Sequence, residues 1–333
     1  HRYGPAELRS WQAEYVRIRS FAAAGPGMPL RNILILTSCQ LISATGAIIM
    51  VTLGGIIGSK LATDPTLATL PVSNKVLCVA ATAIPATVLM KRLGRRRGFA
   101  LASLSAMLAT VLAGVALATE SFAVFIAAGA TFGINMAFTQ QYRYAAAESV
   151  DPENAPRAIS YVLLGAIGGA LVGPELVKYG QFAVPAVQYL GTLLVIGCLY
   201  ILQSVLFLSL GPLRGEGPEK DAQPTRPLTD VAKQPLFIVA VLGGATAYGV
   251  MTFIMTATPL SMHVHDGFAL EDTAQVIRSH VLGMYVPSLV AGNLIQRFGV
   301  VRIMSIGAAG LVGACLIGLQ GQSYMHYWLS LIH

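Results

Sequence analysis

The chain alternates between long apolar runs and short polar segments. Nine of these runs are long enough for an α-helix to cross the hydrocarbon core of a membrane. They cover residues 32–58, 70–90, 98–119, 122–142, 157–177, 187–210, 236–260, 275–296 and 300–319. Backbone polar groups in lipid must be paired within the chain, and these runs lack the alternation of β-barrel strands. The pattern therefore predicts an all-α membrane protein.

The composition agrees with this prediction and argues against other classes. Of the 333 residues, 55% are hydrophobic and 11% are charged, whereas soluble proteins carry about 25% charged residues. The four cysteines, Cys39, Cys78, Cys198 and Cys315, lie far apart inside apolar runs, so we interpret them as core residues and expect no metal site. No phosphate-binding loop, dinucleotide fingerprint or nucleophile elbow is present, so we expect neither a cofactor nor an enzyme.

The basic residues are distributed unevenly among the predicted loops. Of the 22 Lys and Arg residues, 18 lie before the first run or around the loops after the second, fourth, sixth and eighth runs. Because basic loops stay on the inner side of a membrane, we expect the N-terminus on that side. This placement accounts for the net charge of +7 without nucleic-acid binding. Either a bacterial inner membrane or an organelle membrane, mitochondrial or plastid, is consistent with this distribution of basic residues.

A hydrophilic segment after the sixth run, rich in Pro, Gly and charge, predicts a linker at 211–235 on the basic side. It separates a six-helix bundle at 32–210 from a second bundle at 236–333. Residues 1–31 form a basic extension, which fits a mature end after removal of a targeting peptide, a tag remnant or a surface helix. The last piece, 323–333, is too short to cross. We therefore expect nine full spans, part of a tenth, and either a fragment or a partner that covers this end.

Two loops in equivalent positions of the two halves share a motif. One runs from Met90 to Gly98, the other from Gly292 to Arg302. Both contain Arg-x-Gly followed by basic residues: a glycine allows a sharp turn, and basic side chains complement the C-terminal ends of helices. The residues that carry this predicted gating-loop motif are Arg92, Gly94, Arg95 and Arg96 in the first copy, and Gly292, Arg297 and Gly299 in the second.

The doubled motif resembles the signature of the major facilitator superfamily, Gly-x-Leu-Ala-Asp-Arg-x-Gly-Arg-Lys. The acidic position, which in the family joins a charge network between domains, is Lys91 in one copy and Gln296 in the other. A second stretch, Gly165-x-x-Gly168-Gly169-x-x-x-Gly173-Pro174, resembles the fifth-helix motif of this family, which is often found in exporters; Gly169, Gly173 and Pro174 carry it. Residues 258–260 and 280–284 are similar to a bacterial branch that includes riboflavin importers.

This resemblance implies a bundle in which spans one, four, seven and ten line a central cavity. Polar side chains inside spans are costly and therefore informative. The candidates for the cavity are Gln40, Asn135, Gln140, Tyr161, Tyr248, Thr252 and His280. For each residue alone, a hydrogen bond between helices is the simpler explanation. Together they predict a neutral pocket lined by aromatic residues.

Few titratable groups occur inside the predicted spans. His280 and Arg278 are the candidates for proton coupling, and both are also explained as caps at the outer end of the eighth span. We expect Glu175 and Lys178, at the outer end of the fifth span, to form an ion pair at the interface.

Two functions remain open. The first is a secondary transporter of the major facilitator type, which moves a small organic solute through the lipid bilayer by alternating access. The alternative is a transporter-derived, non-transporting structural subunit of a larger membrane complex, with neighbouring subunits as partners. The missing acidic positions and the short last piece motivate this alternative.

Overall fold

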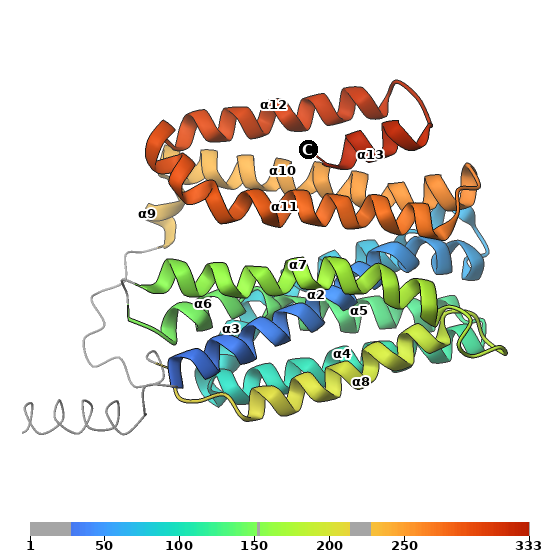
Figure 1. The fold of residues 1–333 in the computed structure, drawn as a ribbon, viewed down its shortest axis with the longest axis horizontal. Coiled ribbons are helices and arrows are strands. Elements are labelled where there is room, and N and C mark those ends of the chain that lie inside the picture. The colour runs from blue at the N-terminus through green and yellow to red at the C-terminus, as the bar shows by residue number, and fades with distance from the viewer. Residues whose placement is uncertain (1–27, 152–153, 214–227, 333) are drawn as a thin grey trace, which may run out of the picture.

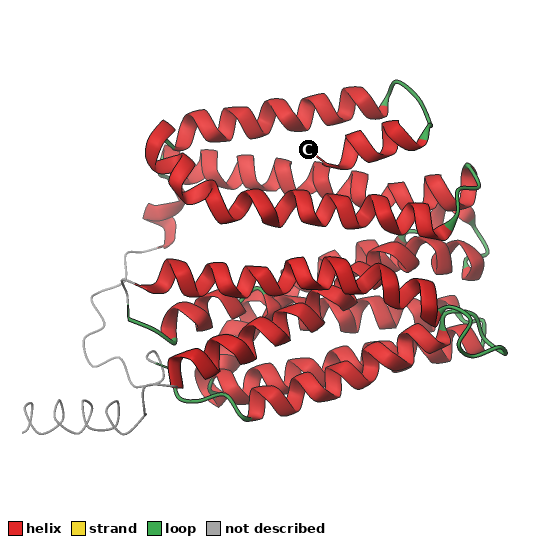
Figure 2. Cartoon of the chain, in the orientation of Figure 1, coloured by secondary structure: helices red, strands yellow, loops and turns green. Residues whose placement is uncertain are grey.

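Helices joined by short turns make up the computed structural model, which describes residues 28–151, 154–213 and 228–332, apart from the side chains at 28, 29, 228, 229, 292, 293 and 296 (Figures 1 and 2). The first half contains α2 (Met28–Leu61), η1 (Pro65–Leu67), α3 (Leu70–Leu93), α4 (Arg95–Ala118), α5 (Phe122–Thr139), α6 (Tyr142–Glu148), α7 (Ala155–Gly180) and α8 (Leu190–Leu208). The second contains α9 (Leu228–Ala232), α10 (Pro235–Pro259), the π-helical η3 (Leu260–His265), α11 (Leu270–Phe298), α12 (Val300–Gly318) and α13 (Tyr324–Ile332). The described residues contain no strand, so the all-α prediction is confirmed.

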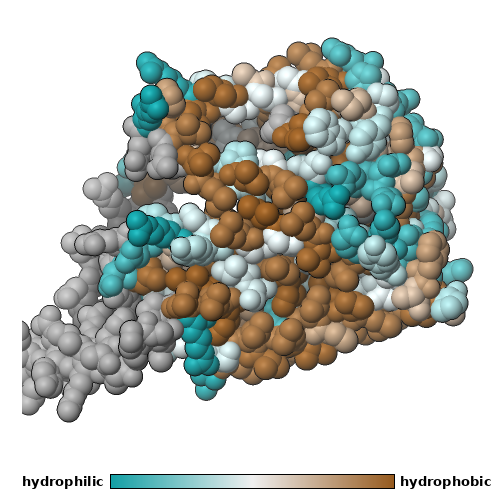
Figure 3. All heavy atoms as spheres, in the orientation of Figure 1, coloured by the Kyte–Doolittle hydropathy of each residue, from teal (hydrophilic) through white to brown (hydrophobic). Residues whose placement is uncertain are grey.

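Eight helical segments are long and apolar enough to cross a membrane. They are 30–61, 65–93, 95–118, 122–148, 155–180, 190–208, 235–265 and 300–318. The ninth predicted span lies in α11, which is 29 residues long but carries Glu271, Asp272, Arg278 and Arg297, and it is not one of the eight. The predicted count of nine is therefore not confirmed. Hydrophobic residues cover the middle of the molecule, and hydrophilic residues gather towards its two ends (Figure 3).

The long helices run up and down, so alternate turns lie at opposite ends of the molecule. The α3–α4 and α11–α12 turns, which carry the two copies of the basic motif, share one end, on the left in Figure 1. We call this the basic end, and the opposite end, with the turns 62–69 and 266–269, the far end. Most of the predicted N-terminal extension and linker falls outside the described residues, and the last predicted piece forms α13.

The first half is built around a close contact between α2 and α7. A Cβ atom added to Gly165 of α7 would lie 2.2 Å from the backbone oxygen of Thr37 in α2, and one added to Gly169 would lie 2.6 Å from the Cβ of Ala44. Because only glycine fits at these distances, the helix backbones can approach and gain dispersion contacts, which are the main attraction between helices in lipid. Thr37 also donates its hydroxyl to the backbone oxygen of Tyr161, at 3.3 Å.

The predicted fifth-helix motif continues this contact. Gly173 faces Ile48 of α2, because a Cβ atom at Gly173 would lie 3.0 Å from Cγ2 of Ile48. Pro174 follows it, buried inside α7. The motif therefore lies on the face of α7 that packs against α2, and α2 is largely surrounded by the first half.

We predict that Gly165→Ala destabilises the protein, because its new methyl group would overlap a backbone atom that cannot rotate away. Overpacking of this kind costs about 1–3 kcal/mol. Gly307→Ala is the matched control, since no heavy atom lies within 4 Å of a Cβ at Gly307 in α12. That change is expected to be neutral or slightly stabilising, because Ala favours the helix. Thermal unfolding of both variants in detergent measures the difference, and equal stabilities would contradict the prediction.

Candidate functional site

The two halves meet near the far end through apolar side chains. Their cluster consists of Ile48, Val51 and Ala170 from the first half and Met262, Val276, Ile277, Val281 and Leu331 from the second. Each of these residues is at most 7% exposed. At the other end, by contrast, every residue of the second half from Ala232 to Gly249 is exposed. The described contact between the halves is thus concentrated near the far end, and we call it the seam.

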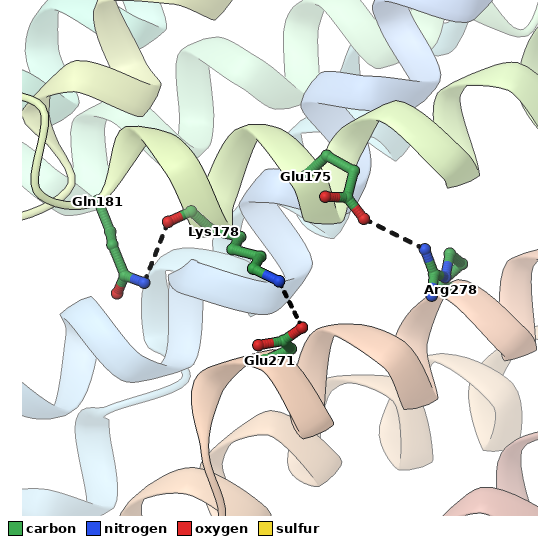
Figure 4. Close-up of polar contacts among 5 residues, drawn as sticks. All are labelled: Glu175, Lys178, Gln181, Glu271 and Arg278. Atoms are coloured by element: carbon green, nitrogen blue, oxygen red, sulfur yellow. Dashed lines mark hydrogen bonds and ion pairs between the residues drawn. The ribbon is translucent and has the colours of Figure 1, made fainter.

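Two ion pairs join α7 to α11 beside this apolar cluster (Figure 4). Nζ of Lys178 lies 2.6 Å from Oε1 of Glu271, and Nη1 of Arg278 lies 3.4 Å from Oε1 of Glu175. The expected pair between Glu175 and Lys178 is therefore replaced by two pairs across the seam, because both residues lie on the side of α7 that faces α11. The lysine and Glu271 side chains are 40% and 66% exposed, so each pair contributes at most about 1 kcal/mol.

A polar cluster at the far end holds the second half together. The Tyr327 hydroxyl donates to Oδ2 of Asp266 at 2.5 Å and lies 2.6 Å from the hydroxyl of Ser261. Burial raises the pKa of the Tyr327 phenol, and the hydrogen bond to the Asp266 carboxylate raises it further. This cluster ties α13 to the segment that follows α10.

Towards the basic end, polar side chains gather at a break between α5 and α6. The helix is interrupted at Gln140 and Gln141, and Oε1 of Gln140 accepts a hydrogen bond of 3.3 Å from Nη2 of Arg143. The guanidinium of Arg143 also lies 5.4 Å from the centre of the Tyr144 ring. The fourth apolar run was predicted to end at 142, which leaves Arg143 in the following loop. The structure places Arg143 inside the helical segment 122–148, which ends five residues after it.

Two tyrosines of the second half belong to the same region. Tyr285, in α11, lies within electrostatic range of Arg143 and of Tyr248, in α10. Tyr248 is 47% exposed, and Thr252 follows it by one turn and is half-buried. Arg143, with Gln140 bound to it, and Tyr248 therefore both lie near Tyr285, at the boundary between the halves. Tyr285 was missed by the sequence analysis, although it is a polar aromatic residue in a predicted span, as Tyr248 is.

The remaining predicted cavity residues have different surroundings. Asn135 is 1% exposed, and its amide donates to the backbone oxygen of Ala102 at 2.8 Å, which links α5 to α4. His280 is 6% exposed, with Nδ1 2.6 Å from the backbone oxygen of Leu331 in α13. Both residues therefore form contacts inside one half. Gln40 is half-buried beside α7, and the side chain of Tyr161 is 52% exposed on α7.

A buried network under the α5–α6 break holds α6 in place. The amide of Gln203, in α8, donates to the hydroxyls of Tyr142 and Ser43, each at 2.9 Å. The ring of Tyr142 packs between Phe99 and Phe207, with centroid distances of 4.9 and 5.1 Å. Because Tyr142 is anchored by α4 and α8, the backbone of the next residue, Arg143, is held in place. Gln203 carries a large polar side chain in the middle of an apolar run, and this is the signal that would have identified it.

The two basic turns have the same backbone conformation. Gly94 has φ 79° and ψ 157°, and Gly299 has φ 84° and ψ 153°. In both turns the glycine N–H donates to a carbonyl four residues earlier, at 3.0 and 2.9 Å. A positive φ of this size favours glycine, so both positions of the repeat require it. Gly292 lies outside the residues whose surroundings the structure describes.

The side chains of the two turns differ. Arg95 forms two hydrogen bonds of 2.6 Å to the carboxylate of Glu148, which ties the start of α4 to the end of α6. The corresponding position in the second copy is Val300, so this ion pair has no equivalent there. Arg92 and Arg96 are exposed, and the guanidinium of Arg297 lies 5.4 Å from the ring centre of Phe298.

Comparison with known proteins gives a consistent result. Residues 35–332 match the sequence pattern of the Major Facilitator Superfamily. The chain is 36% identical over 305 residues to the riboflavin transporter RfnT of Brucella anthropi, covering 91% of this chain and 76% of that protein. It is 27% identical over 302 residues to YddS, an uncharacterised transporter of the same type from Bacillus subtilis, covering 86% and 69%.

Solved structures with a similar fold include a bacterial homologue of the human lysosomal transporter Spinster. Its inward-facing structures, occupied and unoccupied, superpose with TM-scores of 0.66 and 0.65. Each covers 92% of this chain and 72% of the homologue, at 16% sequence identity. At this identity the similarity establishes the fold.

We predict that Lys178→Glu loosens the seam, because it places two carboxylates opposite each other on α7 and α11. Adding Glu271→Lys restores the pair with reversed polarity. The readout is the rate at which a maleimide modifies Ala274→Cys, a buried position on α11, with the accessible native cysteines replaced by serine. We expect the rate to rise about fivefold in the single variant, which corresponds to about 1 kcal/mol, and to fall back in the double variant. Equal rates in the single and double variants would show that the pair does not act on the seam.

Proposed function

Because the chain belongs to the major facilitator superfamily, we propose that it carries a planar aromatic solute of the riboflavin class by alternating access of its two halves. The family resemblance drawn from the doubled basic motif is confirmed. Members of this superfamily are integral, multi-pass membrane transporters, so the expectation that the chain is not an enzyme is confirmed as well. Since the relatives are transporters, the structural-subunit alternative is not favoured.

The observation that carries the proposed substrate class is the group of side chains between the halves. Riboflavin has an uncharged, planar ring system with several hydrogen-bond acceptors. Tyr248 and Tyr285 offer aromatic faces and hydroxyl groups, and Gln140 and Thr252 offer further polar groups. Such a combination of apolar surface with a few placed polar groups is typical of small-molecule sites. The relationship to the Brucella riboflavin transporter supports the same class.

The distribution of charge supports an orientation. Because 18 of the 22 basic residues lie towards one side, we place the basic end in the cytoplasm. The seam then closes the outer side of the protein, and the space beside Gln140 and Arg143 opens inwards. The conformation is therefore inward-facing, one of the two states that alternating access requires. A bacterial inner membrane is the corresponding location, as the bacterial relatives suggest.

The orientation predicts which introduced cysteines react from outside the cell. Thr63→Cys lies in the exposed far-end turn, and Asn154→Cys lies in the exposed turn before α7 at the basic end. In intact cells a membrane-impermeant maleimide is expected to label the first variant, whereas both are labelled after the membrane is opened. Labelling of Asn154→Cys in intact cells would reverse the orientation.

The proposed function predicts riboflavin uptake by cells that express the protein and cannot synthesise the vitamin. Tyr248→Ala is expected to raise the KM for uptake about tenfold, because it removes both an aromatic face and a hydroxyl group from the site. Phe253→Ala is the matched control: it removes an aromatic side chain from the same helix that is 74% exposed. Uptake of labelled riboflavin measures both. Absence of uptake by the wild-type protein would contradict the proposed function.

A further inference from the structure

Arg143 is a cation inside a membrane-spanning segment. It lies on α6, within the apolar helical segment 122–148, and precedes the end of that segment by five residues. Among the described residues no carboxylate lies within ion-pair distance of Arg143, whereas Arg95, in the nearby basic turn, is paired with Glu148. A charge within a span is costly, so such residues face a cavity or a partner and mark functional sites.

The contacts of Arg143 leave most of its donors available. Its guanidinium donates to Gln140 at 3.3 Å and lies 5.4 Å from the ring centre of Tyr144. A guanidinium has five N–H donors in a planar fork, so one amide oxygen satisfies a small part of them. The side chain is exposed and lies within electrostatic range of the Tyr285 hydroxyl in the facing half. Its remaining donors are therefore available to a solute beside Tyr285.

The backbone around Arg143 is suited to a binding site. The helix is interrupted at Gln140 and Gln141, immediately before the turn that carries Arg143. Substrate sites in transporters are typically formed by discontinuous spanning helices. On the other side of α6, Tyr142 is fixed by the hydrogen bond to Gln203 and by two aromatic rings. Arg143 is therefore presented by a rigid support, which lowers the entropy cost of binding.

We propose that Arg143 binds the solute directly and selects planar heterocycles that carry a ring carbonyl next to a second acceptor atom. This inference rests on the proposed function and deepens it. The guanidinium fork matches two adjacent acceptors, and its flat face stacks on aromatic rings. The riboflavin ring carries carbonyl oxygens beside ring nitrogens, whereas its ribityl chain carries hydroxyl groups alone. The ring is thus the part of the solute that Arg143 recognises, with Tyr248 and Tyr285 contributing from the second half.

The test compares riboflavin uptake by wild type, Arg143→Gln and Arg143→Lys, with Arg157→Gln as the matched control. Arg157 is an exposed arginine at the start of α7, so its replacement removes the same charge near the same end. We expect Arg143→Gln to raise KM at least tenfold while the maximal rate changes less, because hydrogen bonds to a charged group are lost. Arg143→Lys keeps the charge but loses the fork, so it is expected to restore uptake only in part. Arg157→Gln is expected to behave as wild type.

Competition separates binding of the ring from a structural role. Lumichrome, a related ring without the sugar chain, and ribitol, the chain without the ring, are added as competitors. We expect the inhibition constant of lumichrome to rise with KM in Arg143→Gln, because the same contact is lost. Inhibition by ribitol, if present in the wild type, is expected to stay unchanged. Amounts of folded protein in the membrane are measured for each variant, so that KM is compared at known expression.

The outcomes distinguish the two proposals. Absence of uptake by the wild type would overturn the proposed function, and the role of Arg143 with it. Uptake by the wild type with an unchanged KM in Arg143→Gln would overturn this inference and leave the proposed function standing. Full rescue by Arg143→Lys would show that a point charge suffices, which contradicts recognition by the planar fork.

Discussion

The contact between the two halves at the far end is the interaction on which the rest of the structure depends. It consists of tightly packed apolar residues, such as Met262 and Ile277, flanked by two partly exposed ion pairs. In lipid the attraction between helices is mainly dispersion, and each exposed ion pair adds at most about 1 kcal/mol. A seam of this kind can hold one arrangement of the halves and still open during a transport cycle. Strongly buried charge pairs in the same place would resist opening, because separating them leaves uncompensated charges.

The first half, in contrast to the seam, is packed rigidly. The backbones of α2 and α7 touch at Gly165 and Gly169, where no larger residue fits, and the Gln203 network joins α2 to α6 and α8 beneath the α5–α6 break. Packing at this density does not deform gradually, because side chains already fill the available space. Movement is therefore expected at the seam, while the first half moves as a unit. This places Arg143 and Gln140 on a rigid body, and Tyr248 and Tyr285 on the body that moves against it.

The sequence predicted the helices and the doubled turn well, because both leave local signals. Long apolar runs mark helices in lipid, and a glycine at positive φ leaves its mark in each copy of the repeat, at Gly94 and Gly299. The direction in which a polar side chain points depends on the tertiary structure, so the hydrophobic pattern of the sequence does not predict it. Asn135 and His280, like Tyr248, are polar residues inside predicted spans, yet each forms its hydrogen bond within one half.

The ion pairs and Arg143 illustrate why the rest of the site could not be predicted. Glu175 and Lys178 are three residues apart, which favours a local pair. The facing helix α11 supplies Arg278 and Glu271 instead, and a sequence does not reveal that α7 and α11 are neighbours. Arg143 was assigned to a loop because the apolar run ends at 142, whereas Ala145, Ala146 and Ala147 continue the helix beyond it.

The charges at the basic end oppose closure of the two halves there. The acidic positions of the motif are Lys91 and Gln296, and the carboxylate of Glu148 pairs with Arg95 inside the first half. Closing the basic end would therefore bring basic groups of both halves together without a carboxylate from either motif between them. Like charges repel over about 8 Å at physiological salt, so closure at this end has an electrostatic cost. A solute whose acceptor atoms bind Arg143 satisfies donors that closure would otherwise bury unpaired, and in this way its binding favours the closed state.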